Sequence, residues 1–382
     1  MRLPWGYLVG MLAMLLASCQ PAAHAPTALP GLTQTITPES GTNPLPAALY
    51  FLSEDPTGIA ALYRLSDVSQ PASLVASAPG AASITDYDLS ISTQRMAYLA
   101  GDQLYVQRLD GSPPILILEG DAATATPAFL ERLAAPRWSP DGQVLAFAYH
   151  GIQLYRPATG ELINILPDTS TGDSSRNARA LYAPVSWSPD GTRLLVSVSL
   201  SQGIGLGILT LTVSAFELLP PDTGCCQAAW TNDGQDILIA NPYPSMGLTG
   251  LWRYRLNGAE LTPLITSPAE GASITLVGWP HQDASGIILA FYTHSVSADY
   301  EPVPVSLVSL SQDLPPQIIP LRAETFSPHE VLWASDGSLA AAVIPAPGAA
   351  AWSASGTIVL IPTADTLSVQ AVANGYNLHW GP

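Results

Sequence analysis

The sequence contains no lysine, only three cysteines, and few charged residues of either sign. Its 13 cationic side chains are all arginine and stand against 30 acidic ones, so the formal net charge is −17. A field of this sign repels phosphate backbones and anionic lipid surfaces, and no cluster of arginines interrupts it. Nucleic acid is therefore excluded as an expected partner. Three cysteines also exclude a fold that is held together by several disulfides.

Long apolar runs are missing as well, apart from one at the N-terminus. Hydrophobic residues make up 47% of the chain and charged residues 11%. This composition supports a large core and excludes disorder over most of the length. The 382 residues could form two average domains, but all-β barrels and propellers use this length as one domain.

The N-terminus has the pattern of an export signal. Arg2 precedes an apolar stretch over residues 3–16, which is too short for a comfortable bilayer span. The stretch ends in Leu16-Ala17-Ser18-Cys19, which resembles the bacterial lipobox in each of its four positions. The resemblance implies that a diacylglyceryl group is attached to the Cys19 thiol, that the chain is cleaved before Cys19, and that the new amine is acylated. The alternative is an ordinary secretory signal followed by an incidental cysteine.

The segment after Cys19 is predicted to be a tether. From Gln20 to about Ala47 it is dominated by proline, alanine and threonine, has no apolar period, and carries Glu39 as its single formal charge. We therefore expect a signal peptide over residues 1–18, a lipidated cysteine with its tether over residues 19–47, and a folded domain over residues 48–382.

The folded part contains a repeat. Trp138-Ser139-Pro140-Asp141-Gly142 recurs as Trp187-Ser188-Pro189-Asp190-Gly191, and weaker copies begin at residues 230, 279 and 333, so successive tryptophans are 49, 43, 49 and 54 residues apart. Asp-Gly supplies the positive φ of a tight hairpin turn, and the flanking β-branched and aromatic runs are typical of strands. A tryptophan on the first strand of each copy can fill the gap between neighbouring sheets. These features predict a four-stranded blade for each copy.

Two degenerate copies complete the pattern. The first comprises residues 86–92, 95–99, 103–109 and 115–118, and the second has only three strands, at residues 48–52, 59–65 and 73–76. Its missing first strand is supplied by residues 376–380, which end 47 residues after Trp333. We therefore predict an all-β fold: a single β-propeller of seven four-stranded blades, closed when the C-terminal strand completes the first blade. Six blades remain possible if one degenerate copy fails.

The Trp-Ser-Pro-Asp-Gly core, followed by an apolar strand and an Ile/Leu-Tyr strand, resembles the WD40-like (PD40) repeat of TolB-type propellers. The resemblance covers roughly residues 48–382 and is close in the copies at Trp138 and Trp187. It implies a fold and leaves the function open, because function resides in sites and not in folds.

Longer loops are expected on one face of the propeller, where they connect second to third strands and blade to blade. Lengthened loops on a rigid scaffold are a common way to gain binding surface. We predict a recognition face there, with candidate binding residues Tyr243, Tyr300, Trp352, Arg176 and Arg179. The alternative is that these loops are tolerated insertions with no ligand.

Motifs for catalysis or metal binding are not found in the sequence. It has no Gly-x-Ser-x-Gly elbow and no His-Glu-x-x-His spacing, so no catalytic residue, metal or cofactor is predicted. Asp86 and Asp88 could ligate calcium, but two acids on one strand are more often polar edge residues. Cys225-Cys226 is interpreted as two buried thiols in preference to a vicinal disulfide, and His379 is expected near the channel.

The leading functional hypothesis is a non-catalytic, lipid-anchored binding or scaffold module for a protein, peptide or glycan of the cell envelope. It is expected to be a monomer on the extracytoplasmic side. An aspartate after the lipidated cysteine would resemble the inner-membrane retention signal of enteric-type bacteria; here Gln20 follows Cys19, which implies the outer membrane where the host has one. One alternative is an extracytoplasmic hydrolase or lyase with its site at the channel mouth. Another is a purely structural envelope protein.

Overall fold

The computed structural model describes residues 44–121, 133–170, 179–200, 203–220, 227–241, 249–266, 274–295, 304–313, 315–346 and 354–381. The chain separates into two compact units, Met1–Gly41 and Thr42–Pro382. The described residues all belong to the second unit.

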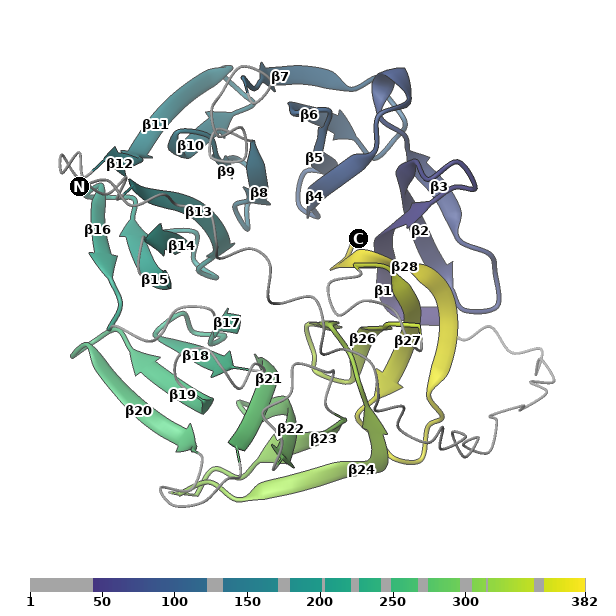
Figure 1. The fold of residues 1–382 in the computed structure, drawn as a ribbon, viewed down its shortest axis with the longest axis vertical. Helices are drawn as coiled ribbons and strands as arrows, with labels where there is room; N and C mark the ends of the chain where they lie inside the picture. The colour runs from purple at the N-terminus through teal and green to yellow at the C-terminus, as the bar shows by residue number, and fades with distance from the viewer. Residues whose placement is uncertain are drawn as a thin grey trace, which may run out of the picture. The chain divides into compact units, whose positions relative to one another are not determined.

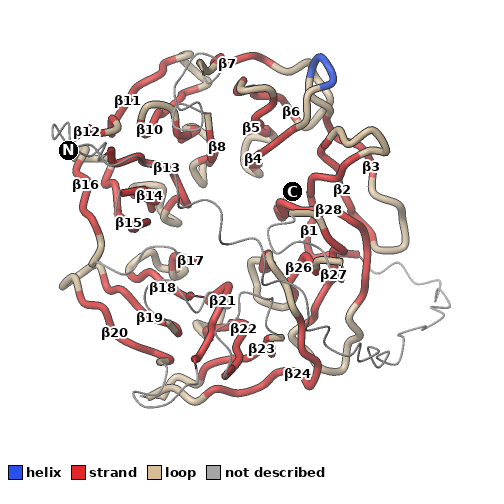
Figure 2. The backbone as a smooth tube through the Cα atoms, in the orientation of Figure 1, coloured by secondary structure: helices blue, strands red, loops and turns tan. Residues whose placement is uncertain are grey.

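Antiparallel strands make up nearly all the regular structure of this unit (Figures 1 and 2). Three four-stranded sheets contain β4 (Ile84–Ser90), β5 (Arg95–Ala100), β6 (Gln103–Arg108) and β7 (Ile115–Glu119); β8 (Ala134–Trp138), β9 (Leu145–Ala148), β10 (Gly151–Arg156) and β11 (Glu161–Pro167); and β17 (Gln227–Trp230), β18 (Asp236–Asn241), β19 (Gly250–Arg255) and β20 (Glu260–Ile265). A fourth contains β21 (Ile274–Gln282), β22 (Ile288–Ser295), β23 (Val305–Leu310) and β24 (Ile318–Phe326).

Two further sheets are larger. A five-stranded sheet contains β12 (Thr169–Ser170), β13 (Arg179–Trp187), β14 (Arg193–Leu200), β15 (Gly203–Thr210) and β16 (Ala215–Leu218). A seven-stranded sheet runs in the order β25 (Glu330–Trp333), β26 (Leu339–Ile344), β27 (Gly356–Pro362), β28 (Gln370–Trp380), β1 (Pro44–Glu54), β2 (Ala60–Asp67) and β3 (Ser73–Ala76).

The sheets follow one another round a ring, with β4, β8, β13 and β17 toward its centre and β7, β11, β16, β20 and β24 at its periphery (Figure 1). This arrangement is consistent with the predicted propeller, and the all-β class is confirmed. The helical structure of the described residues is one 3-10 turn, Pro79–Ala81. None of their helices is long and apolar enough to cross a membrane.

The last strand pairs with the first strand of the chain. Residues 370–375 of β28 pair with β27, and residues 376–380 pair with β1, where Trp380 lies opposite Leu49 and Tyr376 opposite Leu52. β1 begins at Pro44, earlier than the predicted domain start at residue 48, because Pro44 pairs with Asp67 of β2. The last four residues of the predicted tether are therefore part of a strand.

The repeated turns have the predicted conformation. Gly142, Gly191, Gly234 and Gly337 have φ values of 68°, 68°, 65° and 73°, a region that glycine enters without steric cost. In the copy at Trp187, the Ser188 hydroxyl donates to Asp190 Oδ1 at 2.6 Å, and the same oxygen accepts the Thr192 N–H at 3.0 Å. The aspartate thus organises the turn from inside while the glycine permits its backbone.

The repeat tryptophans connect neighbouring sheets. The indole N–H of Trp187 donates to the carbonyl oxygen of Arg137 at 2.9 Å, that of Trp230 to Ser186 O at 3.3 Å, and that of Trp333 to Trp279 O at 2.8 Å. Each bond leads from one inner strand to the inner strand before it in the chain. The predicted position of these side chains between sheets is therefore confirmed for these three copies, and the polar end of each indole is satisfied.

Candidate functional site

The predicted recognition face lies almost entirely outside the described residues. This applies to Tyr243, Tyr300, Trp352 and Arg176, and also to Cys19 and the Cys225-Cys226 pair. Arg179 is the first residue of β13 and pairs with Ser170 of β12. These residues stay predictions.

A different set of residues comes together on the inner strands. It consists of the residues directly before the tryptophan, or its counterpart, in successive copies of the repeat: His379, Asp88, Arg137, Ser186, Ala229, Gly278 and Leu332. Side chains alternate along a strand, so a residue next to a tryptophan packed between sheets points to the other side. The first four members are polar or charged and come from adjacent strands, whereas the last three are not polar.

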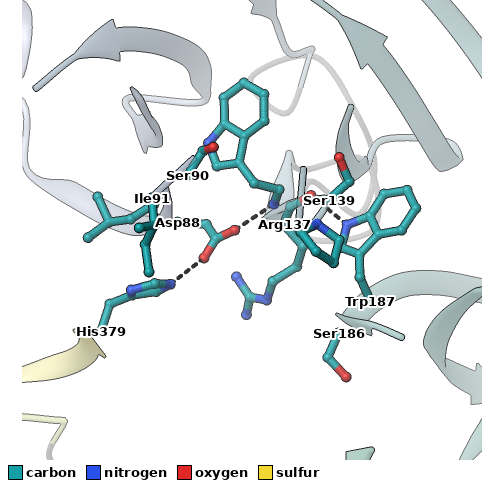
Figure 3. A pocket seen from close by; sticks show the side chains of 11 residues that line it. Asp88, Ser90, Ile91, Arg137, Ser139, Ser186, Trp187 and His379 are labelled. Carbon is teal, nitrogen blue, oxygen red and sulfur yellow. Dashed lines mark hydrogen bonds and ion pairs between the residues drawn. The ribbon is translucent and has the colours of Figure 1, made fainter. Parts of the chain in front are cut away.

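The four polar members line one cavity of about 270 Å³ (Figure 3). Seven further residues complete its lining: Leu89, Ser90, Ile91, Trp138, Ser139, Pro140 and Trp187. The cavity therefore lies where β28, β4, β8 and β13 approach one another. It includes the start of the β4–β5 and β8–β9 turns, and so belongs to the face with short turns and not to the predicted long-loop face.

Asp88 is the central charge of this pocket, and both of its carboxylate oxygens are engaged. Oδ1 lies 2.9 Å from His379 Nε2, and Oδ2 accepts the backbone N–H of Trp138 at 2.5 Å. The side chain is only 12% exposed, so its charge is largely removed from water and needs these partners.

His379 is held by acceptors at both ring nitrogens. Besides the contact of Nε2 with Asp88, Nδ1 lies 2.6 Å from the carbonyl oxygen of Trp380. The imidazole ring of His379 is therefore fixed between two oxygen atoms, one from Asp88 and one from the main chain.

Arg137 extends into the same space (Figure 3). Its Nε donates to Val185 O at 3.1 Å and its Nη1 to Pro136 O at 2.6 Å. The carboxylate oxygen Oδ1 of Asp86 lies 3.9 Å from the same Nη1. Among the residues that the structure describes, none accepts a hydrogen bond from Nη2. The Ser186 hydroxyl, from the same position of the next copy, is buried and has no hydrogen-bond partner there either. The pocket thus offers unpaired donors.

A cluster behind the pocket positions His379. Glu330 accepts the backbone N–H groups of Asn377 at 2.8 Å and Leu378 at 2.5 Å, and the Asn377 side chain donates to Asp86 at 3.0 Å. The hydroxyl of Tyr87 donates to the carbonyl oxygen of Asn377 at 2.7 Å. Burial raises the pKa of Glu330, and the negative charge of Asp86 raises it further. Burial also raises the pKa of Tyr87. These contacts hold β28 against β25 and β4.

The sequence placed Asp86 and Asp88 together as possible calcium ligands and His379 near the channel, but it did not indicate that Asp88 and His379 lie in one pocket. It also missed Arg137 and Ser186. The alignment of the repeats could have identified these residues, since Arg137, Ser186 and His379 each come directly before a tryptophan and Asp88 occupies the same position in a copy without one. Within the described ranges there is no group of three or more histidine, cysteine or acidic side chains placed to hold a metal ion.

No protein-family model matches the chain, and no curated protein matches it. Solved structures do match. A puromycin-hydrolysing peptidase from Mycobacterium tuberculosis is 14% identical, with a TM-score of 0.60, over 86% of this chain and 51% of its own length. An oligogalacturonate lyase in complex with manganese is 11% identical, with a TM-score of 0.56, over 85% of this chain and 84% of its own.

A periplasmic gluconolactonase from Pseudomonas aeruginosa is 14% identical over 88% of this chain and 99% of its own, with a TM-score of 0.53. TolB from Acinetobacter baumannii is 14% identical over 87% of this chain and 81% of its own. Its TM-score of 0.46 is too low to carry an argument. At such identities the matches show the fold alone: the chain has a β-propeller fold.

Proposed function

We propose that this protein is a lipid-anchored β-propeller of the cell envelope that binds a ligand without transforming it. The proposed site is the pocket of His379, Asp88, Arg137 and Ser186. The observation that carries the proposal is the position of the His379 ring, since both of its nitrogens lie close to an oxygen atom, at 2.9 and 2.6 Å. A general base needs a nitrogen free to take a proton, whereas a ring held on both sides is suited to recognition.

The test compares two arginine variants of the full-length, lipidated protein in crosslinked cells. Arg137→Gln alters the pocket, and Arg156→Gln removes the same charge from β10, where Arg156 pairs with Glu161 at 2.6 Å on the exposed surface. We expect an envelope partner, identified by mass spectrometry, to be captured by the wild type and by the Arg156 variant and to be lost from the Arg137 variant. Equal capture by all three forms would remove the pocket from the function.

An enzyme is the second candidate, and the Asp88–His379 contact inside a cavity favours it. Hydrolases and a lyase are among the solved structures with this fold. Turnover of an extracellular polymer that disappears in His379→Gln and in Asp88→Asn would establish this alternative. A purely structural role would follow if changes in the pocket affected neither binding nor turnover.

The proposal includes seven blades and their closure. β28 would serve twice, its residues 370–375 as the outer strand of the last blade and residues 376–380 as the inner strand of the first. The pairing of these two segments with β27 and β1 supports this assignment, as does the seven-stranded sheet that results. The five remaining sheets would form one blade each.

The proposed location is the extracytoplasmic side of the envelope, in the outer membrane where the host has one. Cleavage before Cys19 and lipidation of its thiol would anchor the mature chain, and the segment after Cys19 would hold the propeller off the lipid. The four lipobox positions support this part of the proposal. The partner is a protein, peptide or glycan of the envelope, and the protein acts as a monomer.

A further inference from the structure

We propose that the pocket captures the free C-terminal carboxylate of a peptide whose last side chain is apolar. This inference rests on the proposed binding function and names the ligand of the same site.

The donors and acceptors of the pocket are not balanced. One oxygen of Asp88 accepts the Trp138 N–H, and the other lies 2.9 Å from His379 Nε2. By contrast, in the described part of the chain Arg137 donates through Nε and Nη1 and leaves Nη2 over, and the buried Ser186 hydroxyl has no partner. A ligand atom that enters this space is therefore met by donors and must be an acceptor to satisfy them.

The charges of the pocket favour an anion at Arg137. Asp88 faces His379 at 2.9 Å, and the guanidinium of Arg137 has no acidic partner of its own among the lining residues. Asp86 is the nearest acid to Arg137, but at 3.9 Å it lies beyond hydrogen-bond distance and accepts the Asn377 amide instead. A planar guanidinium with a free edge matches a carboxylate.

The polarity of the lining changes along the pocket. Asp88 and Arg137 lie on the strands, whereas Ile91 and Pro140 lie three residues further on, in the turns. Ile91 is 53% exposed, so its apolar side chain is accessible to a ligand at the rim of the pocket. A ligand with a charged end and an apolar group next to it would place the charge on Arg137 and the apolar group on Ile91 and Pro140.

The size of the pocket also limits the ligand. A cavity of about 270 Å³ is at the lower limit of the roughly 300–1,000 Å³ that holds drug-sized ligands. It fits the end of a chain and not a strand or helix of a partner. A sugar acid also carries a carboxylate, but its ring hydroxyls need polar partners that Ile91 and Pro140 do not provide.

The test is isothermal titration of the purified, lipidated protein in detergent with three probes. They are N-acetyl-Ala-Ala-Leu with a free carboxylate, the same peptide with a C-terminal amide, and sodium glucuronate. We expect saturable binding of the free peptide, binding of the amide that is weaker by roughly tenfold or more, and no saturation by glucuronate.

Three variants locate the binding. Ser186→Ala should weaken binding of the free peptide by roughly threefold. It should not lower the melting temperature, because the Ser186 hydroxyl has no hydrogen-bond partner in the described part of the protein to lose. Arg137→Gln should weaken the free peptide by roughly tenfold and abolish the difference between peptide and amide. Arg156→Gln, the matched control on the outer surface, should leave both affinities unchanged.

The outcomes separate this inference from the function on which it rests. If the amide binds as well as the free peptide but Arg137→Gln weakens both, the pocket binds peptides and the carboxylate assignment is wrong. Preference for glucuronate would overturn the peptide in favour of a glycan. If no probe binds, the inference fails, while loss of the cellular partner in Arg137→Gln would still support the pocket.

Discussion

At the scale of single residues, the repeat depends on an aspartate that accepts several hydrogen bonds within one turn. The Ser139 and Ser188 hydroxyls hold the pKa of Asp141 and Asp190 below the usual 3.8. The backbone N–H groups of Gln235 and Ser338 act in the same way on Asp233 and Asp336. The same small interaction therefore recurs around the ring.

These turns predict acid sensitivity. A carboxyl group whose pKa is lowered by folding contributes stability above its unfolded pKa, and this stability is lost as the pH falls through the folded pKa. We expect the melting temperature to change little between pH 7 and pH 5 and to fall below about pH 4. Scanning calorimetry of the wild type and of a variant with asparagine at positions 141, 190, 233 and 336 tests this.

The comparison isolates the turns because other groups titrate too. Glu330 has a raised pKa, so its contribution has the opposite sign, and it is present in both proteins. The asparagine variant should show a shallower acid dependence. Parallel curves for the two proteins would assign the acid sensitivity to other carboxyl groups.

The tryptophans permit a second prediction at this scale. Trp333 donates its indole N–H to Trp279 O, whereas the indole nitrogen of the equally buried Trp138 has no partner among the described residues. Substitution by phenylalanine removes a similar buried apolar area at both positions, but it removes a hydrogen bond only at Trp333. Trp333→Phe should therefore cost about 1 kcal/mol more than Trp138→Phe in urea unfolding. Equal costs would show that the inter-sheet bond adds nothing beyond packing.

At the scale of elements, β28 both connects two neighbouring strands of the sheet and supplies a side chain to the pocket. It pairs with β27 and β1, and it carries His379 into the pocket. Glu330 fixes the strand by accepting two of its N–H groups, while Asp86 and Tyr87 hold Asn377 from β4. The pocket is therefore complete only when the terminal strand is in place.

Glu330→Ala tests this coupling. It leaves two buried N–H groups without acceptors, so we expect a loss of about 2–4 kcal/mol in the free energy of unfolding. Glu260→Ala, on the exposed part of β20, is the control and should be nearly neutral. Peptide affinity should also fall in the Glu330 variant, although Glu330 does not line the pocket. Unchanged affinity in a folded Glu330 variant would contradict the positioning role.

At the scale of the whole molecule, the charge of −17 and the predicted N-terminal signal lead to expectations about membrane attachment that do not depend on the propeller. Such a charge keeps the chain away from anionic surfaces, so stable membrane attachment requires a covalent anchor.

Labelling with radioactive palmitate tests the anchor. The wild type should incorporate label and partition into detergent, and Cys19→Ser should do neither while keeping the same melting temperature. Label in the Cys19→Ser form would place the lipid elsewhere, and no label in the wild type would favour an ordinary secretory signal.

Much of the fold was predictable because its determinants are local. The strands at residues 95–99, 103–109 and 115–118 were expected within a residue or two of β5, β6 and β7, since alternation and turn residues mark them. The pairing of residues 376–380 with β1 agrees with the expected role of the C-terminal strand, which the spacing of tryptophans indicated. The domain start was placed later than β1 begins, because a proline-rich strand edge does not differ in composition from a tether.

The candidate site was not predictable in the same way. Asp88 and His379 are separated by most of the chain and lie in different sheets, and only the packing of β28 beside β4 places their side chains 2.9 Å apart. The sequence by itself determined the repeat, the turn chemistry and the all-β class, since each follows from neighbouring residues. Only the tertiary structure decided which side chains share a pocket, because the ring brings the same position of successive copies together and makes four polar residues neighbours.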